Sequence, residues 1–82
     1  MKIPDDFTLF AWMGQDGSGE VGIQAVPTPL GINPAVASTE VVAEILGDAA
    51  QQRCNLLGTQ MALVRFDKDG ITVIRTISPQ TN

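Results

Sequence analysis

Residues 39–57 read TEVVAEILGDAAQQRCNLL, and they decide the fold because no other segment is long and periodic enough to predict a helix. Apolar and small residues recur there every three or four positions, which places them on one side of a helix. A hydroxyl at Ser38 or Thr39 can accept from the free amides of the first turn, and Gly58 suits the left-handed conformation that ends many helices. Gly47 costs about 1 kcal/mol relative to alanine inside a helix and indicates a close contact with another backbone. The predicted buried stripe consists of Val42, Ile45, Leu46, Ala49, Ala50, Cys54 and Leu57.

Two pairs of short alternating segments flank the predicted helix. Residues 7–13 and 21–26 are joined by a glycine-rich turn, and residues 61–66 and 71–77 are joined by a short hairpin turn. Each pair predicts an antiparallel hairpin. The chain therefore predicts an α+β fold of the order ββαββ, with two hairpins flanking one helix and a four-stranded, mainly antiparallel sheet that has the helix on one face.

The alternation also predicts the registers of the two hairpins. In the first hairpin we expect Met13 opposite Val21, which sets Trp12 over Gly22 so that the indole covers the exposed backbone of the glycine. The second hairpin is expected to pair Phe66 with Ile71, Val64 with Val73, and Leu63 with Ile74.

The connection between the second strand and the helix contains three prolines within residues 27–37. Each proline removes a backbone donor, so the composition favours an extended, partly polyproline path. The segment also carries Leu30, Ile32 and Val36, which is more apolar than a solvated linker needs. Two roles stay open for it: a bridge that packs on the core, or a functional loop.

A chain of 82 residues predicts a single small domain over residues 1–82, with loose ends at 1–6 and 78–82. A domain of this size buries only about 60–65% of its unfolded surface, so a supplement to its core is expected. One cysteine and no histidine exclude an internal disulfide and a zinc site of the usual Cys/His type. Association with another chain is the remaining supplement.

The charge balance bounds the partners. The formal net charge is −4, and the five basic residues are spread along the chain rather than clustered. We therefore expect no nucleic-acid binding and no attraction to an anionic membrane. No apolar run approaches the roughly 18 residues of a membrane span, and the N-terminus lacks the apolar core of a signal peptide. A cytoplasmic location is expected, in agreement with the single cysteine.

Little in the sequence indicates catalysis. The commonest general base, histidine, is absent, and Cys54 lies on the inward stripe of the helix, where a thiol is usually inert. The glycine-rich residues 16–19 lack the lysine and hydroxyl of a phosphate loop. Asp67 and Asp69 are spaced as at the start of a calcium loop, but the residues that follow supply no further carboxylate. We expect no catalytic residue, no metal site, no cofactor and no enzymatic activity.

One helix can cover only one face of a four-stranded sheet, so the second face becomes the candidate site. We assign the helix to the face that carries Phe7, Leu9 and Met13, which should leave the opposite face polar. That opposite face is only half polar, and bare apolar residues there would form a patch of the size that a partner usually covers. The predicted interface residues are Phe10, Trp12, Val26, Met61, Leu63, Arg65 and Ile74.

Arg65 has two readings. As a functional residue it joins Trp12 and Gln24 in the interface or in a pocket for a small anion. As a structural residue it is an edge-strand charge that discourages further pairing.

The function that follows is a non-enzymatic, self-associating α+β module, of the general character of a small accessory protein of a bacterium or phage, which acts through protein contacts. It is expected to be a homo-oligomer, dimer or higher, through the sheet face away from the helix. The proline-rich segment could instead fold back over that face. The alternative function is a small-molecule binding module with a pocket between the Pro27–Ala37 loop and the sheet, and no particular ligand-binding residue is assigned to it.

Overall fold

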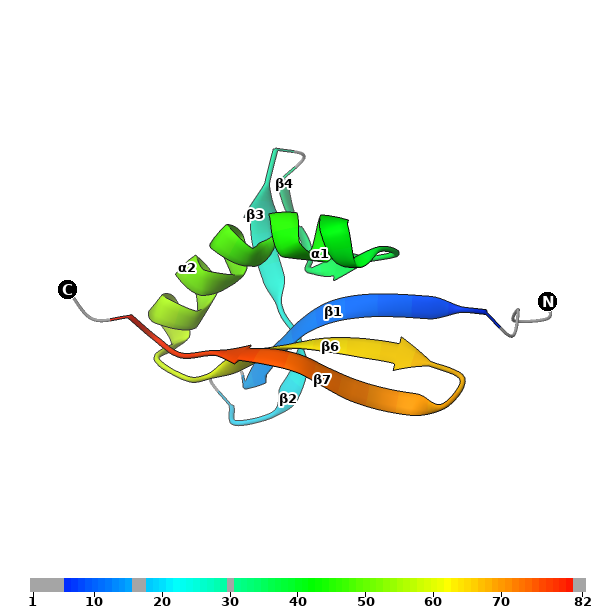
Figure 1. Cartoon of the computed structure of the whole chain (residues 1–82). Helices are drawn as coiled ribbons and strands as arrows, with labels where there is room; N and C mark the ends of the chain where they lie inside the picture. Colours follow the sequence, from blue (N-terminus) through cyan, green and yellow to red (C-terminus); the bar gives the residue numbers. More distant parts are fainter. Residues whose placement is uncertain (1–5, 16–17, 30, 81–82) are drawn as a thin grey trace.

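The computed structural model describes residues 6–15, 18–29 and 31–80. In this part of the chain, two helices pack on a sheet, and a small hairpin stands beside them (Figure 1). In chain order the elements are β1 (Thr8–Gln15), β2 (Val21–Ile23), β3 (Ala25–Thr28), β4 (Gly31–Pro34), β5 (Val36–Ala37), α1 (Glu40–Ile45), α2 (Gly47–Leu57), β6 (Met61–Asp67) and β7 (Gly70–Ile77).

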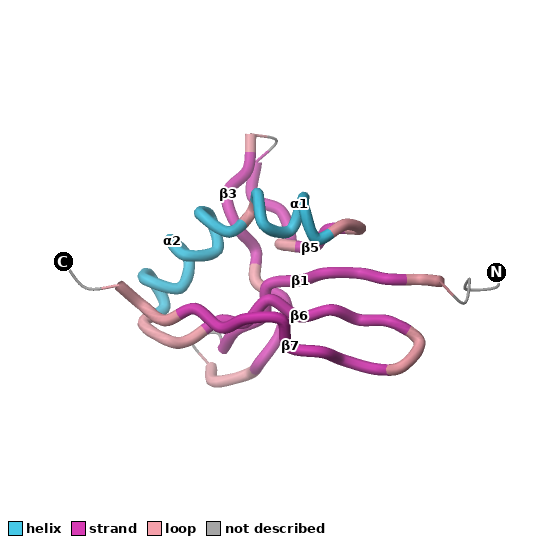
Figure 2. The backbone as a smooth tube through the Cα atoms, viewed as in Figure 1, coloured by secondary structure: helices cyan, strands magenta, loops and turns pink. Residues whose placement is uncertain are grey.

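The main sheet has five strands, in the order β2-β1-β6-β7, with β5 also paired to β1. Every pairing in it is antiparallel. Strand β6 pairs with one edge of β1. The other edge of β1 pairs with β5 at Phe10 and Ala11 and with β2 from Met13 to Gln15. Figure 2 shows β5 between α1 and β1. The predicted α+β class and the mainly antiparallel sheet are confirmed, but the predicted four strands and single helix are too few.

The segment predicted as an extended proline loop is mostly an additional hairpin, formed by β3 and β4. We call β3 and β4 together the arm. Three backbone hydrogen bonds close a ring at its base: Trp12 N donates to Ala35 O (3.0 Å), Ala35 N to Gln24 O (2.8 Å), and Gln24 N to Trp12 O (3.0 Å). The chain therefore leaves the main sheet at Gln24 and returns at Ala35. Pro27 and Pro34 are tolerated because a two-stranded sheet consists of edge strands only.

The predicted helix over residues 39–57 is divided at Leu46 into α1 and α2. Both predicted ends are confirmed. The hydroxyl of Thr39 accepts from Val42 N at 3.2 Å, and Gly58 adopts a φ of 70° while its N–H donates to Cys54 O. Gly47 opens α2, where an added Cβ would lie 3.3 Å from the guanidinium of Arg75 and 3.7 Å from the Trp12 ring. The close contact that Gly47 indicated is thus with side chains.

The helices cover the face of the sheet that was predicted to be bare. Trp12 and Leu63 are fully buried beneath them, and the indole Nε1 of Trp12 donates to Ala43 O at 3.0 Å. The assignment of the helix to the face of Leu9 and Met13 was therefore wrong. The alternation of side chains defines the two faces of the sheet but does not show which of them the helices cover. The indole decides between them, because its N–H needs an acceptor when buried and the helix layer supplies one.

The registers agree with the sequence prediction in part. The pairs Phe66–Ile71 and Val64–Val73 are confirmed, whereas a bulge between Leu63 and Val64 shifts the partner of Leu63 from Ile74 to Arg75. In the first hairpin the pairing is two residues away from the prediction, so Ile23 lies opposite Met13 and Trp12 does not lie over Gly22. A two-residue shift leaves every side chain on its expected face.

Part of the predicted loose C-terminal end is fixed to α2. Gln51 Nε2 donates to Ser78 O at 2.9 Å, and Gln80 N donates to the side-chain oxygen of Asn55 at 2.7 Å. Residues 1–5 and 81–82, also predicted to be loose, lie outside the described residues.

Candidate functional site

The predicted interface residues do not form a surface. Most of them belong to the core beneath the helices and the arm, and Ile74 packs against that core. A partner cannot reach these side chains while the helices are in place. The proline-rich segment covers part of the core through Ala35 and Ala37, which are buried, but not through Ile32, which is 77% exposed; Leu30 lies outside the described residues. The buried members are Phe10 (8% exposed), Trp12, Val26, Met61 and Leu63 (each 0–1% exposed).

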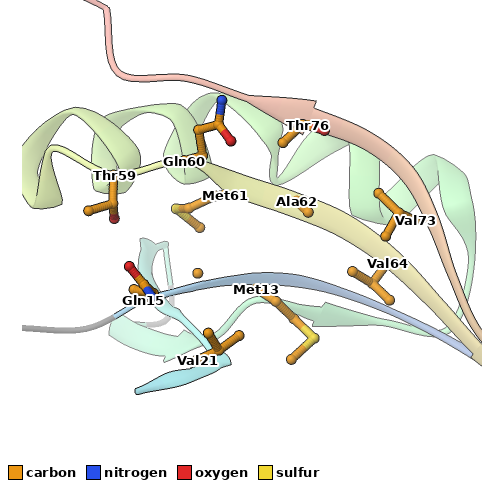
Figure 3. Close-up of a pocket in the computed structure, with 11 residues that line it drawn as sticks. Met13, Gln15, Val21, Thr59, Gln60, Met61, Ala62, Val64, Val73 and Thr76 are labelled. Atoms are coloured by element: carbon orange, nitrogen blue, oxygen red, sulfur yellow. The ribbon is translucent and has the colours of Figure 1, made fainter. Parts of the chain in front are cut away.

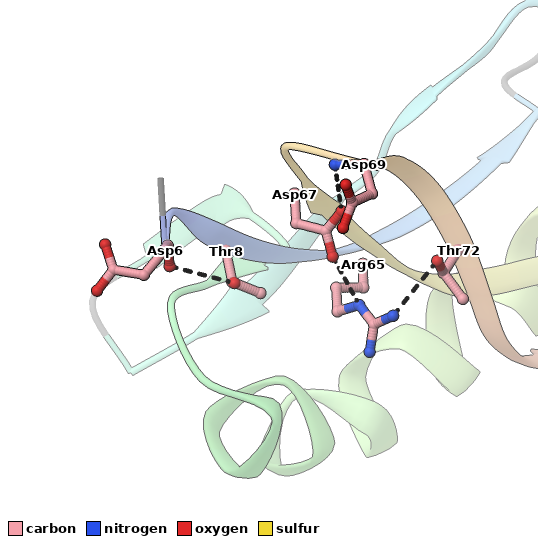
Figure 4. Close-up of polar contacts among 6 residues, drawn as sticks. All are labelled: Asp6, Thr8, Arg65, Asp67, Asp69 and Thr72. Atoms are coloured by element: carbon pink, nitrogen blue, oxygen red, sulfur yellow. Dashed lines mark hydrogen bonds and ion pairs between the residues drawn. The ribbon is translucent and has the colours of Figure 1, made fainter. Parts of the chain in front are cut away.

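Arg65, the remaining predicted interface residue, lies at the hairpin end of β6 and β7 (Figure 4). Its Nε is 3.2 Å from Asp67 Oδ2, and its Nη2 donates to Thr72 Oγ1 at 3.4 Å. The second oxygen of Asp67 accepts from Asp69 N at 2.9 Å. Arg65 and Asp67 therefore hold each other and shape the turn, so the pocket of Arg65 with Trp12 and Gln24 is not formed.

The arginine that does meet Trp12 is Arg75. Its guanidinium carbon lies 4.9 Å from the centroid of the Trp12 ring, and its Nη2 is 2.8 Å from Glu44 Oε2 on α1. Arg75 reaches this position because the bulge in the β6–β7 ladder directs it to the helix side. The cation and the ring attract each other, so Arg75 fastens the edge strand to the helix layer.

The bare surface is the opposite side of the main sheet, which we call the outer face. Residues paired across antiparallel strands share a face, so the registers identify its members. Seen in Figure 3, Met13, Val64 and Val73 gather over β1, β6 and β7 with the helices behind the strands. Among the described strand residues, the outer face carries Leu9, Ala11, Met13, Gln15, Val21, Ile23, Val36, Ala62, Val64, Phe66, Ile71, Val73 and Thr76.

The outer face exposes bulky side chains and holds no ionisable group among the strand residues that the structure describes. Val21 is 65% exposed, Ile23 45%, Ile71 68% and Val73 61%. Phe7, which precedes β1 and continues its alternation, is 42% exposed. At about 100 Å² for a fully exposed side chain of this kind, these five residues alone present on the order of 300 Å², and partly exposed neighbours raise the patch to roughly 400 Å². Apolar patches of this size are often functional.

A shallow depression of about 620 Å³ hollows one end of the outer face. Met13, Val64 and Val73 form its apolar side, while Gln15 and Gln60 stand at its polar end (Figure 3). None of the eleven residues that line it is charged. The depression therefore suits apolar side chains from a partner better than it suits an ionic ligand.

Cys54 and Ala50 are fully buried, as the helical stripe predicted. The prediction was wrong for Val42 and Ile45, which are 46% and 72% exposed. Burial raises the pKa of the thiol, and a backbone hydrogen bond from Met61 opposes this shift. The Sγ atom donates to Thr59 O at 3.0 Å. In the described residues no group of three or more Cys, Asp or Glu side chains is placed to hold a metal ion.

The pocket predicted between the Pro27–Ala37 loop and the sheet takes another position. Because most of that segment is the arm, the hollow beside it lies between the arm and α2, with a volume of about 510 Å³. The sequence did not predict this groove, since the groove depends on the hairpin within the proline-rich segment. Gly31 was the sequence signal for a turn within this segment, and it adopts a φ of 111° at the start of β4.

Comparisons of the chain with protein-family models, with curated proteins and with solved structures found no match. Neither helix in the described ranges has the length and apolar character needed to cross a membrane.

Proposed function

We propose that the protein is a self-associating module that acts through protein contacts, and that two copies pack through their outer faces. The observation that carries the proposal is an apolar sheet face without ionisable groups among the described strand residues. Sheets packed face to face bury such side chains between them at a spacing of about 10 Å. The proposed association surface therefore lies on the side of the sheet opposite to the predicted one. The physical reason is unchanged, because one helix layer covers only one face of a sheet.

Charge favours the outer face as the contact between copies. Each chain carries a formal charge of −4, from nine acidic and five basic residues, so two copies repel each other at long range. A face without ionisable groups keeps those charges at the rim, where solvent and salt screen them. Burying it against a second copy also desolvates no ion, which avoids the largest cost of forming an interface.

The size of the patch is consistent with a weak to moderate dimer. A standard interface buries about 800 Å² per partner, of which roughly 57–65% is apolar. The roughly 400 Å² of exposed apolar surface on the outer face approaches that share. Gln15, Gln60 and Thr76 can supply part of a polar rim, because they border the depression.

Sedimentation equilibrium from micromolar to near-millimolar concentration tests the proposal. We expect the weight-average mass to rise above the 8.7 kDa of one chain as concentration increases. Val73→Asp, at a site that is 61% exposed on the outer face, should weaken association at least tenfold because it buries a carboxylate. Lys68→Gln, at an exposed site in the turn between β6 and β7, changes the net charge by the same amount and is the matched control.

A wild-type protein that stays at 8.7 kDa throughout this range would reject the proposal. So would equal weakening by Val73→Asp and by a substitution at an exposed position of the β6–β7 turn such as Asp69→Arg. Circular dichroism spectra of each variant establish that it is folded before its mass is interpreted.

A further inference from the structure

The groove between the arm and α2 has an apolar wall on the arm, whereas the α2 side is mixed and is lined by Gln52, Arg53 and Leu56. Ala25 and Pro27 of β3 and Ile32 of β4 form one wall, and Leu56 of α2 stands on the other. Ile32 and Leu56 are each 77% exposed, so two bulky side chains face solvent beside the groove. The prolines at 27 and 34 remove two backbone donors from the arm, which disfavours addition of a further strand. An occupant would therefore be held through side chains, as a helix is in a groove.

The groove also contains a cation that has no carboxylate partner among the described residues. Arg53 lines it, and the Nε of Arg53 donates to Gln24 Oε1 at 3.4 Å, which is the single interaction found for this side chain in the described ranges. Arg65 and Arg75, by contrast, each lie beside a carboxylate, at 3.2 Å and 2.8 Å. The Nε contact fixes the arginine and leaves the terminal guanidinium nitrogens available to an acidic group.

A surface complementary to this groove lies on α1 of the same chain. Val41 and Ile45, one helical turn apart, are 71% and 72% exposed. Glu40 and Glu44 lie beside them around a shallow hollow, and Glu44 is engaged with Arg75. Glu40 has no ion pair or hydrogen bond with any residue in the described part of the chain. One helical turn thus presents two apolar side chains and an unengaged carboxylate.

We propose that α1 of one copy docks into the arm–α2 groove of a second copy, with Val41 and Ile45 against Ile32 and Leu56 and with Glu40 paired to Arg53. Val41 and Ile45 meet one exposed apolar side chain on each wall, and the unengaged carboxylate of Glu40 matches the unengaged guanidinium of Arg53. The contact joins two different surfaces of the same chain, so it is heterologous and generates a ring or an open chain of copies. It is separate from the outer-face contact and does not require it.

Charge reversal tests the contact without dependence on the outer face. In the Val73→Asp background, which removes the outer-face contact, we expect the mass still to rise with concentration. Arg53→Glu and Glu40→Arg should each weaken this association about tenfold or more, since each sets like charges against each other. An equimolar mixture of the two variants should recover association, because each offers the surface that the other lacks.

Controls of equal charge change come from the turn between β6 and β7. Lys68→Glu alters the net charge as Arg53→Glu does, and Asp69→Arg alters it as Glu40→Arg does. Both residues are exposed, and both controls should leave association within about twofold of the parent. Ile32→Ser should weaken association without any change in charge.

Several results would overturn the inference. One is a Val73→Asp protein that stays at 8.7 kDa up to near-millimolar concentration. Another is an equimolar mixture of Arg53→Glu and Glu40→Arg that associates no better than either variant alone. In that case the loss of association in each variant would come from its net charge or from a contact with another partner. If the outer-face proposal fails instead, the wild type and the Val73→Asp variant associate equally while the charge-reversal pattern remains.

Discussion

Replacing Trp12 with phenylalanine should destabilise the monomer, because the indole is the centre of the core and not part of a partner surface. Trp12 is fully buried, and its Nε1 donates to Ala43 O at 3.0 Å. Trp12→Phe leaves that carbonyl without its donor, which costs about 1–3 kcal/mol in a buried site. The smaller ring also leaves a void, and at about 24 cal/mol per Å³ a gap of roughly 40 Å³ adds about 1 kcal/mol.

The expected loss is therefore about 2–4 kcal/mol in the free energy of unfolding, a large part of the 5–15 kcal/mol typical of small domains. Urea denaturation followed by far-ultraviolet circular dichroism measures it, at concentrations where sedimentation reports the 8.7 kDa species. Val73→Ala is the control on the outer face, where 61% exposure predicts a change of about 0.5 kcal/mol or less.

The fluorescence of the wild-type protein provides a second measurement. A buried indole emits at short wavelength and is shielded from iodide, whereas an indole on an open surface is quenched. A loss below about 0.5 kcal/mol for Trp12→Phe, together with ready quenching in the wild type, would refute the placement of the helices over Trp12.

Two further substitutions test the helix ends and the buried thiol. Thr39→Ala should cost about 1 kcal/mol, because the N–H of Val42 loses its acceptor; Ser38→Ala, next to it and without a capping bond, is the control, and an equal loss in both would contradict the cap. Cys54 should react with a thiol reagent only after unfolding, because the thiol is buried. Its folded pKa is raised, so the unfolded state loses the proton first: stability should be constant below the unfolded thiol pKa of about 8.5 and should fall as pH rises above it. Cys54→Ala should remove that part of the pH dependence in urea titrations, and an unchanged profile would show that another group causes it.

Much of the fold could be predicted from local patterns in the sequence. The capping hydroxyl of Thr39, the terminal glycine Gly58 and the register of the β6–β7 hairpin near its turn all depend on residues close together in the chain. Such features follow from backbone geometry and hydrogen bonding within a few residues, so a single sequence reveals them. The bulge at Leu63 and Val64 is the local exception, because the extra residue has no distinct composition.

The features that the sequence did not reveal depend on long-range packing. The arm required two proline-containing segments to pair with each other, and the ring of bonds at Trp12, Gln24 and Ala35 brings together three distant parts of the chain. The choice of covered face depended on one side chain: the buried indole needs an acceptor, and only the three-dimensional arrangement places Ala43 O within reach.

The candidate site was also predicted only in those aspects that do not depend on long-range packing. One helix layer leaves one face of a sheet uncovered, and this holds for the outer face as it would for the inner one. The identity of the residues depended on the face assignment, so five of the seven predicted residues lie in the core, Ile74 packs against it, and Arg65 lies at the β6–β7 hairpin end. The groove that Arg53 lines was not predicted, because the segment that forms the arm was predicted to be an extended loop.

The composition of the core explains why association is expected to matter for this chain. Its centre combines Trp12, Met61 and Leu63 with several alanines, and alanine lets backbones approach but buries little apolar area. Bulkier residues such as Phe66, Ile71 and Val73 lie on the outer face instead, where the monomer gains less from them. A second copy that covers this face adds apolar burial that a core of this size lacks, and binding to the folded state alone raises stability by mass action. Association of the copies is therefore expected to raise the free energy of unfolding of each chain.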